Sequence, residues 1–133
     1  RIVAPETMPT FEVAAKYDIP IVVHSGWKVH VKSILELAKA FPKMQVGVLH
    51  MMDGEDYFQC ARYDNVFVET SYANHPRRIR QIVDKLGSER AVFGSDYAWS
   101  DQLVEKMKVL RLPLPDNDVE NILYKNAERI LRL

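Results

Sequence analysis

The chain has 133 residues, 47% of them hydrophobic and 27% charged, and its 18 basic side chains balance 18 acidic ones. This size and composition predict a single globular domain over residues 1–133. Balanced charge excludes the basic surface that nucleic acid or an anionic membrane requires, and no apolar run reaches the roughly 18 residues that would cross a bilayer. Cys60 is the only cysteine, which excludes an internal disulfide and indicates a cytoplasmic setting.

Helical and strand patterns alternate along the chain. A helix is expected over 9–17 and a strand over 19–24, followed by a helix with the apolar stripe Ile34, Leu37, Ala38 and Phe41. Strands are expected over 45–50 and 66–71, and then a helix with the stripe Ile79, Ile82, Val83 and Leu86. A last strand over 91–95 precedes helices over about 101–110 and 116–131. Strands that are apolar on both faces predict a parallel sheet covered by helices, either half of a (β/α)8 barrel or a small doubly wound sheet.

Three of these strands end in a polar side chain that suits metal binding or acid–base chemistry. His24, His50 and Asp96 each follow an apolar run. The carboxyl ends of parallel strands meet at one rim, so these side chains are expected to converge. One such histidine is usually a hydrogen-bonded residue at the edge of a core, but three coincident cases favour a site for a divalent ion such as Zn²⁺.

The residues around these strand ends also resemble a known family, the amidohydrolase-related metal-dependent hydrolases and decarboxylases. The resemblance lies in Ile19-Pro20-Ile21-Val22-Val23-His24-Ser25-Gly26, Val48-Leu49-His50-Met51-Met52, the segment from Gly87 to Tyr97 with Gly94-Ser95-Asp96-Tyr97, and the segment from Ile122 to Leu131. It implies an α/β, TIM-barrel-type fold in which this chain forms strands five to eight, the C-terminal half of the (β/α)8 barrel. The resemblance implies that His24 is a metal ligand, that His50 is the catalytic strand-six histidine, which binds metal or polarises a substrate carbonyl, and that Asp96 is both a metal ligand and a proton shuttle.

Two departures from the family pattern stand out. The family's first strand carries a His-x-His pair, and this chain contains no such pair, so it offers at most part of a metal site. The chain begins at Arg1 without a preceding strand, which suggests a fragment. After His50, the sequence Met51-Met52-Asp53-Gly54 delays the glycine that admits substrate in the family.

Other polar and aromatic residues were weighed in the same way. Trp27 and Trp99, each three residues beyond a ligand candidate, and Ser71 at a strand end are candidate substrate-binding residues. Glu69, Thr70, Tyr72 and Asn74 form either a pocket wall or an ordinary polar strand exit. His30, His75, Asp53 and Asp101 are interpreted as residues at helix starts, and Asn126 as a buried, hydrogen-bonded residue of the last helix.

The function that we infer is a metal-dependent hydrolase of the amidohydrolase type, with Zn²⁺ activating water against a small carbonyl or carboxylated substrate. The alternatives are a non-oxidative decarboxylase (a lyase) of the same family, and a non-catalytic half-barrel that self-associates through its open sheet edges. The last alternative makes a homo-oligomer the expected partner state. A nucleotide-binding domain is disfavoured because no glycine-rich phosphate loop follows a strand.

Overall fold

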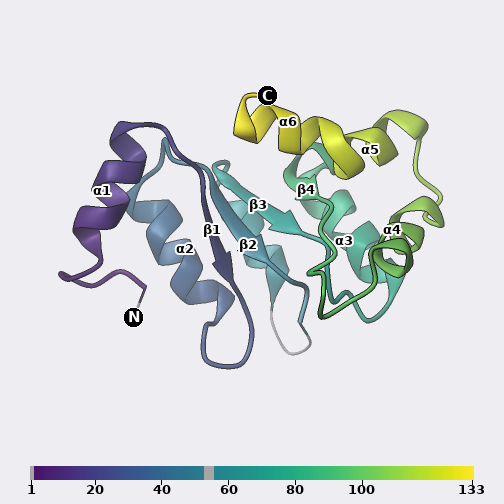
Figure 1. Cartoon of the computed structure of the whole chain (residues 1–133), viewed down its shortest axis with the longest axis horizontal. Coiled ribbons are helices and arrows are strands. Elements are labelled where there is room, and N and C mark those ends of the chain that lie inside the picture. Colours follow the sequence, from purple (N-terminus) through teal and green to yellow (C-terminus); the bar gives the residue numbers. More distant parts are fainter. Residues whose placement is uncertain (1, 53–55) are drawn as a thin grey trace.

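The computed structural model describes residues 2–52 and 56–133, and in these residues four parallel strands alternate with helices (Figure 1). The strands are β1 Ile21–His24, β2 Val46–Leu49, β3 Val66–Glu69 and β4 Ala91–Val92. The helices are α1 Met8–Lys16, α2 Val31–Ala40, α3 Pro76–Leu86, α4 Gln102–Leu110, α5 Asp116–Glu120 and α6 Asn126–Leu131. The predicted α/β class with about four parallel strands is confirmed.

The strands lie in the order β1-β2-β3-β4, so each pairs with the next one along the chain. The register places Val22 beside Gly47, Gly47 beside Phe67, and Glu69 beside Val92. Because side chains alternate between the faces of a sheet, these residues share one face, here called the inner face, while their neighbours point to the outer face. Gly47 lacks a side chain where the Phe67 ring crosses it, since a Cβ there would lie 2.5 Å from that ring.

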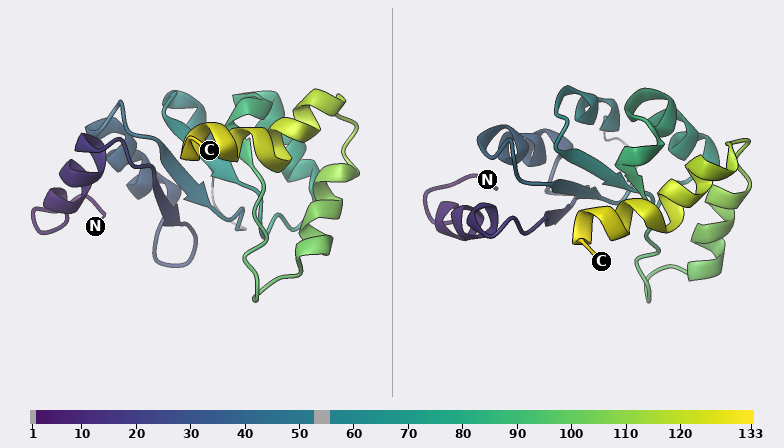
Figure 2. Two further views of the ribbon diagram at one scale, coloured as in Figure 1. Left: turned by 45° about the horizontal axis from the view of Figure 1, so that its top comes forward. Right: turned by 90° about the horizontal axis from the view of Figure 1, so that it is seen from above.

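The main core lies between the outer face and helices α2 and α3, which cover it together (Figure 2). Fully buried side chains from both layers meet there: Val46, Val48, Val66, Val68, Ile34, Leu37 and Ile79. Apolar residues at helical spacing supply the helix side of this core, as the sequence predicts. Asn65 directly precedes β3. Its side-chain amide donates to carbonyl oxygens of Ala38, Phe41 and Met44, which ties the start of β3 to the end of α2 and the segment after it.

The inner face is covered only in part. Ile130 of α6 packs with Phe67 and Val92 in a second small cluster, on the opposite side of the sheet from α2 and α3 (Figure 2). Between α6 and the sheet an apolar cavity of about 150 Å³ remains. At the β1 end Val22 is 54% exposed, so the inner face is open toward that edge.

The elements differ from the sequence expectations mainly at their ends. Strand pairing stops before the polar exits, so β3 ends at Glu69 and β4 at Val92 rather than at 71 and 95. A 3-10 turn over Tyr57–Arg62 was not predicted, and the expected helix over 116–131 contains a π-helical segment, Asn121–Lys125. A π-helical turn contains more residues than an α-helical turn, so it shifts the apolar residues away from regular α-helical spacing. The apolar pattern of the sequence alone does not reveal this shift.

The predicted helix starts are confirmed where the structure describes them: His30, His75 and Asp101 are the N-cap residues of α2, α3 and α4, and the side chain of His30 makes no capping hydrogen bond. Asp101 accepts a hydrogen bond from the backbone N–H of Val104, and His75 accepts one from that of Arg77. Asp53 lies outside the described residues. Asn126 is buried as expected and donates to the carbonyls of Ser88 and Ala91, which ties α6 to the start of β4. None of the described helices is long and apolar enough to cross a membrane.

Candidate metal centre and active site

The candidate site lies at the rim where the parallel strands end. His24 is the last residue of β1, His50 follows β2, and Asp96 lies four residues beyond β4. His50, Tyr72 and Asp96 have left-handed backbone conformations, with φ of 68°, 58° and 49°. Such conformations are uncommon for residues other than glycine and gather at functional sites, where the surrounding structure holds them. The rim is therefore one part of the described chain in which strained backbone and chemically competent side chains coincide.

The two strand-end histidines are neighbours. The ring centroids of His24 and His50 are 4.7 Å apart in an edge-to-face arrangement. His50 is buried, with 6% of its surface exposed, whereas His24 is exposed. The parallel register, which sets the end of β1 beside the end of β2, brings them together as expected. One histidine is thus held within the protein and the other faces the open side of the rim.

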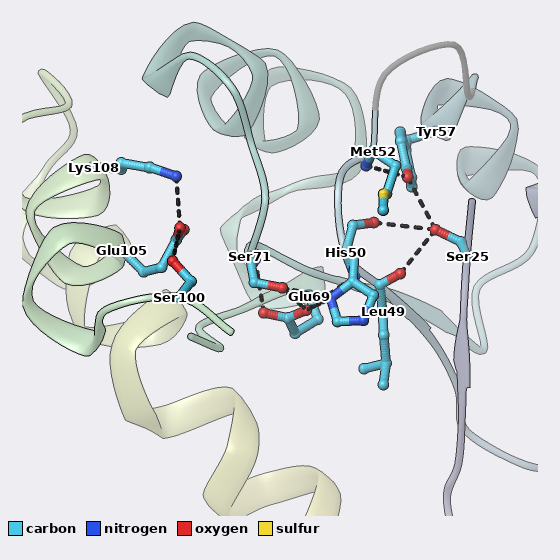
Figure 3. A network of polar contacts seen from close by, with 10 residues as sticks. All are labelled: Ser25, Leu49, His50, Met52, Tyr57, Glu69, Ser71, Ser100, Glu105 and Lys108. Atoms are coloured by element: carbon cyan, nitrogen blue, oxygen red, sulfur yellow. Dashed lines mark hydrogen bonds and ion pairs between the residues drawn. The ribbon is translucent and has the colours of Figure 1, made fainter. Parts of the chain in front are cut away.

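A buried carboxylate holds the position of His50 (Figure 3). Glu69 accepts hydrogen bonds from the backbone N–H of His50 at 2.9 Å, the backbone N–H of Ser71 at 2.7 Å and the Ser71 hydroxyl at 2.7 Å. The Ser71 hydroxyl also lies 2.6 Å from Nδ1 of His50, and Oε2 of Glu69 lies 3.5 Å from the same nitrogen. The backbone and the ring of His50 are therefore both fixed by the Glu69–Ser71 pair.

This network shifts both titrating groups toward their charged forms. The hydrogen bond with Glu69 raises the pKa of His50 above its ordinary value, burial opposes the shift, and the charges of Glu69 and Asp96 add to it. Burial pushes the pKa of Glu69 upward, but the hydrogen bonds from His50 and Ser71 outweigh burial and bring the pKa below its ordinary value. A hydrogen-bonded ion pair in which each partner favours the other's charge explains both directions.

Asp96 faces the same rim from the β4 side. Its negative charge acts on His50 and on Tyr72: partial desolvation, the charge of Asp96 and a hydrogen bond with Asp96 together raise the pKa of the Tyr72 hydroxyl. The carbonyl of Asp96 accepts hydrogen bonds from the backbone N–H groups of Trp99 and Ser100. This tight turn fixes the backbone position of Asp96 beyond β4.

A second polar network joins the ends of β1 and β2. The hydroxyl of buried Ser25 lies 2.8 Å from the carbonyl oxygen of Leu49, 3.2 Å from that of His50 and 2.9 Å from the hydroxyl of Tyr57. Tyr57 in turn accepts a hydrogen bond from the backbone N–H of Met52 (Figure 3). Because Ser25 follows His24 directly, this network holds the two histidines side by side.

The donors at this rim fit part of a metal site. Imidazole nitrogen and carboxylate oxygen are common ligands of divalent ions, and exposed His24 and half-buried Asp96 supply one of each. Within residues 2–52 and 56–133, however, no group of three or more His, Cys, Asp or Glu side chains lies close enough to hold an ion. The metal-ligand roles of His24 and Asp96 therefore stay predictions.

The aromatic candidates and Ser71 have different environments. Trp27 is 85% exposed and its ring lies 6.5 Å from that of His24. It lines a cavity of about 460 Å³ together with Met52, Tyr72, Ala73, Asn74 and Lys108. Trp99 is equally exposed, at 85%, in the turn after Asp96. Ser71 is fully buried behind His50, so its hydroxyl contacts Glu69 and His50 rather than the cavity, and Tyr72 and Asn74 are the wall residues of this strand exit.

Lys108 reaches that cavity from α4 and is held by a buried carboxylate. Glu105 is 3% exposed, and its Oε1 lies 2.7 Å from Nζ of Lys108 and 2.9 Å from the hydroxyl of Ser100 (Figure 3). Ser100 belongs to the turn that Asp96 begins. Glu105 and Lys108 were not predicted from the sequence. The available signal was the acidic Glu105 on the same helix face as Val109, the other buried residue of α4.

The comparisons with known proteins agree with this architecture. The family model described as amidohydrolase matches residues 3–133. An uncharacterised TIM-barrel protein from Bordetella bronchiseptica is 20% identical, with a TM-score of 0.83, and the match covers 99% of this chain and 52% of that one. A 5-carboxyvanillate decarboxylase from Sphingomonas paucimobilis is 18% identical, with a TM-score of 0.79, covering 98% and 54%.

A dihydroxybenzoic acid decarboxylase from Polaromonas sp. JS666, solved with bound manganese and the inhibitor 2-nitroresorcinol, is 11% identical with a TM-score of 0.75, covering 98% and 55%. Comparison with curated protein sequences gave no match. The chain thus spans a little over half the length of these solved structures, and the ion named with the Polaromonas relative is manganese rather than the zinc expected from the sequence. The chain belongs to the amidohydrolase family of metal-dependent enzymes and forms about half of a TIM-barrel fold of that family.

Proposed function

We propose that this chain carries the C-terminal half of the active site of a metal-dependent, non-oxidative decarboxylase that acts on a small aromatic acid. The observation that carries the proposal is the buried His50, held by Glu69 beside His24 and within the field of Asp96. A histidine whose charged form is favoured can protonate carbon, which is the step that this reaction needs. Two solved relatives described as decarboxylases of hydroxylated aromatic acids support the choice of substrate.

His24 and Asp96 are the residues of this chain that would hold the divalent ion, and the ion would fix and polarise oxygen atoms of the substrate. Further ligands would come from outside these 133 residues or from another chain. The identity of the ion is part of the proposal: manganese is favoured by the Polaromonas relative, and zinc by the nitrogen ligand. Loading the protein with each ion in turn and measuring bound metal distinguishes them.

In the proposed reaction, His50 delivers a proton from Nε2 to the ring carbon that bears the carboxylate. The new C–H bond forms at that carbon, the bond to the carboxylate carbon breaks, its electron pair returns to the ring, and CO₂ leaves. The negative charges of Glu69 and Asp96 stabilise the protonated imidazole before the transfer. General acid catalysis of this kind contributes about 10²- to 10⁴-fold to a rate.

The cavity beside the rim suits a one-ring acid. Its volume of about 460 Å³ lies within the usual range for small-ligand sites. Trp27 and Tyr72 supply aromatic walls, and Lys108 supplies a cation for a carboxylate or phenolate group. We assign Trp99 to the outer wall on the Asp96 side, and Ser71 to the support of His50 rather than to substrate contact.

The test uses the protein that contains this chain, loaded with Mn²⁺ and incubated separately with 2,6-dihydroxybenzoate and 5-carboxyvanillate, while released CO₂ is measured. His50→Gln and Asp96→Asn should each lower the rate by at least about 100-fold. Asp84→Asn, which changes an exposed residue near the C-terminal end of α3, is the matched control and should leave it unchanged. Turnover that is unaffected by His50→Gln, or unaffected by removal of all divalent metal, would contradict the proposal.

The hydrolase remains the second candidate because the matching family model is described as amidohydrolase. Hydrolysis would use the same rim, with His50 stabilising an oxyanion rather than protonating carbon. The two reactions differ in their products, since only decarboxylation releases CO₂. A homo-oligomer stays a prediction that rests on the sheet edges at β1 and β4, and sedimentation of the protein tests it.

A further inference from the structure

We propose that Glu69, acting through Ser71, is a positioning residue that holds neutral His50 as the tautomer with its proton on Nδ1 and its lone pair on Nε2. The inference rests on the proposed function only in its consequence, because His50 is the acid in that proposal. The tautomer itself follows from counting the protons that the hydrogen bonds around Glu69 require.

The Ser71 hydroxyl has one proton and two close partners. The hydroxyl donates to Oε2 of Glu69 at 2.7 Å and lies 2.6 Å from Nδ1 of His50. Once its proton is directed at Glu69, the oxygen has only lone pairs left for the ring nitrogen. Nδ1 must therefore bring the proton to this contact, and Nε2 of the neutral ring is left unprotonated.

Glu69 acts as an acceptor in each of its hydrogen bonds to His50 and Ser71. It receives the backbone N–H of His50, the backbone N–H of Ser71 and the Ser71 hydroxyl. A protonated carboxyl group would need an acceptor of its own among these three donors. The downward shift of the Glu69 pKa agrees with an ionised side chain.

The network of Glu69, Ser71 and His50 has little freedom to rearrange. Glu69 is 7% exposed and points to the inner face opposite Gly94, where a Cβ would lie 2.5 Å from Cδ of Glu69 and closer still to Oε1. Gly94 therefore leaves room that the carboxylate fills. On the other side, the carbonyl of His50 accepts from Ser25, so the left-handed backbone at His50 is held from both directions.

The two nitrogens of the His50 ring therefore have different roles. Nδ1 keeps its proton throughout, because Ser71 and Glu69 hold it. Nε2, on the far side of the ring, is the nitrogen that gains and loses a proton at the rim. Glu69 does not touch the substrate in this arrangement; it determines which nitrogen does.

Two-bond ¹H–¹⁵N correlation of histidine rings tests the inference directly, because the protonated and unprotonated ring nitrogens give separate signals. The protein is labelled with ¹⁵N-histidine and studied without metal or substrate, at a pH where the ring is neutral. The chain has four histidines, and a His50→Gln sample identifies the signals of His50. The expected pattern for the wild type is a protonated Nδ1 and an unprotonated Nε2.

Two variants separate the contributions. In Glu69→Ala the Ser71 hydroxyl loses its acceptor and can donate to Nδ1, so the proton should move to Nε2. In Ser71→Ala the Nδ1–H can donate to Oε2 of Glu69, which lies 3.5 Å from Nδ1 in the wild-type structure, so the wild-type tautomer should persist. Thr70→Val is the matched control, because the Thr70 hydroxyl has no hydrogen-bond partner within the described residues, and it should leave the pattern unchanged.

A wild-type His50 protonated on Nε2 would overturn the inference even if Glu69→Ala failed to fold. A folded Glu69→Ala protein with an unchanged pattern would overturn it as well. These results are independent of catalysis: a protein that shows the Nδ1–H tautomer but no turnover with any metal refutes the proposed function alone. Turnover with the opposite tautomer refutes this inference alone.

Discussion

Replacing Gly94 with alanine should destabilise the protein by about 3 kcal/mol, because the new methyl group and the Glu69 side chain claim the same space. A Cβ at position 94 would lie 2.7 Å from Cγ and 2.5 Å from Cδ of Glu69. The carboxylate must then move away from the three donors that it accepts from, and hydrogen bonds to charged groups contribute about 1.5–3 kcal/mol each.

The full loss of these bonds is not expected, because the displaced carboxylate can reach water at the open part of the inner face. Alanine also restricts the unfolded chain more than glycine does, which offsets about 0.5–1 kcal/mol of the cost. The net value of about 3 kcal/mol corresponds to a fall in Tm of about 10 °C at the usual unfolding entropy per residue.

Urea unfolding followed by circular dichroism and by tryptophan fluorescence measures the change in free energy. Glu69→Ala is the matched background, since it removes the side chain that the methyl group displaces. In that background Gly94→Ala should cost less than about 0.5 kcal/mol, which gives a double-mutant coupling of more than 2 kcal/mol. An equal cost of Gly94→Ala in both backgrounds would refute the steric reasoning.

Three further predictions follow from other parts of the chain. Burial raises the pKa of the Cys60 thiol to about 12, so a disulfide reagent at pH 8 should label it only in urea; stoichiometric labelling of the native protein would contradict this. Asn65→Ala should cost about 2 kcal/mol in urea unfolding, because the amide donates to three carbonyls; an unchanged midpoint would argue against it. Lys108→Met should weaken binding of 2-hydroxybenzoate, followed by tryptophan fluorescence, by about tenfold without changing binding of phenol; equal losses for both ligands would remove the proposed role of this cation.

The sequence predicts the sheet and the rim well because both depend on local signals. Apolar runs of four to six residues define β1 to β4, and parallel pairing then requires that His24 and His50 leave neighbouring strands at the same edge. Their contact at 4.7 Å between ring centroids confirms this part of the expectation. The metal and catalytic roles assigned to His24, His50 and Asp96 stay predictions.

The support of the rim could not be predicted in the same way, because it depends on register between strands. Glu69 interrupts an apolar strand and Ser71 follows it at a spacing of two, which places both on one face. This pattern was interpreted as a polar strand exit, and Ser71 as a substrate contact. Only the structure shows that Glu69 pairs with Val92 and that its side chain reaches over Gly94. Only the structure shows that the Glu69 carboxylate accepts from the backbone N–H of His50.

The sequential order of the sheet bears on how the chain can be assembled. Each strand pairs with the strand that precedes it, so no pairing waits for a distant segment, and the loops to be closed are short. During synthesis from the N-terminus, β1, α2 and β2 can pack before β3 has left the ribosome. The strands β3 and β4 can then each pair with a strand that is already folded. The contacts at the rim therefore form late, since the Glu69 carboxylate that hydrogen-bonds the backbone of His50 and the aspartate beyond β4 arrive only with the third and fourth strands.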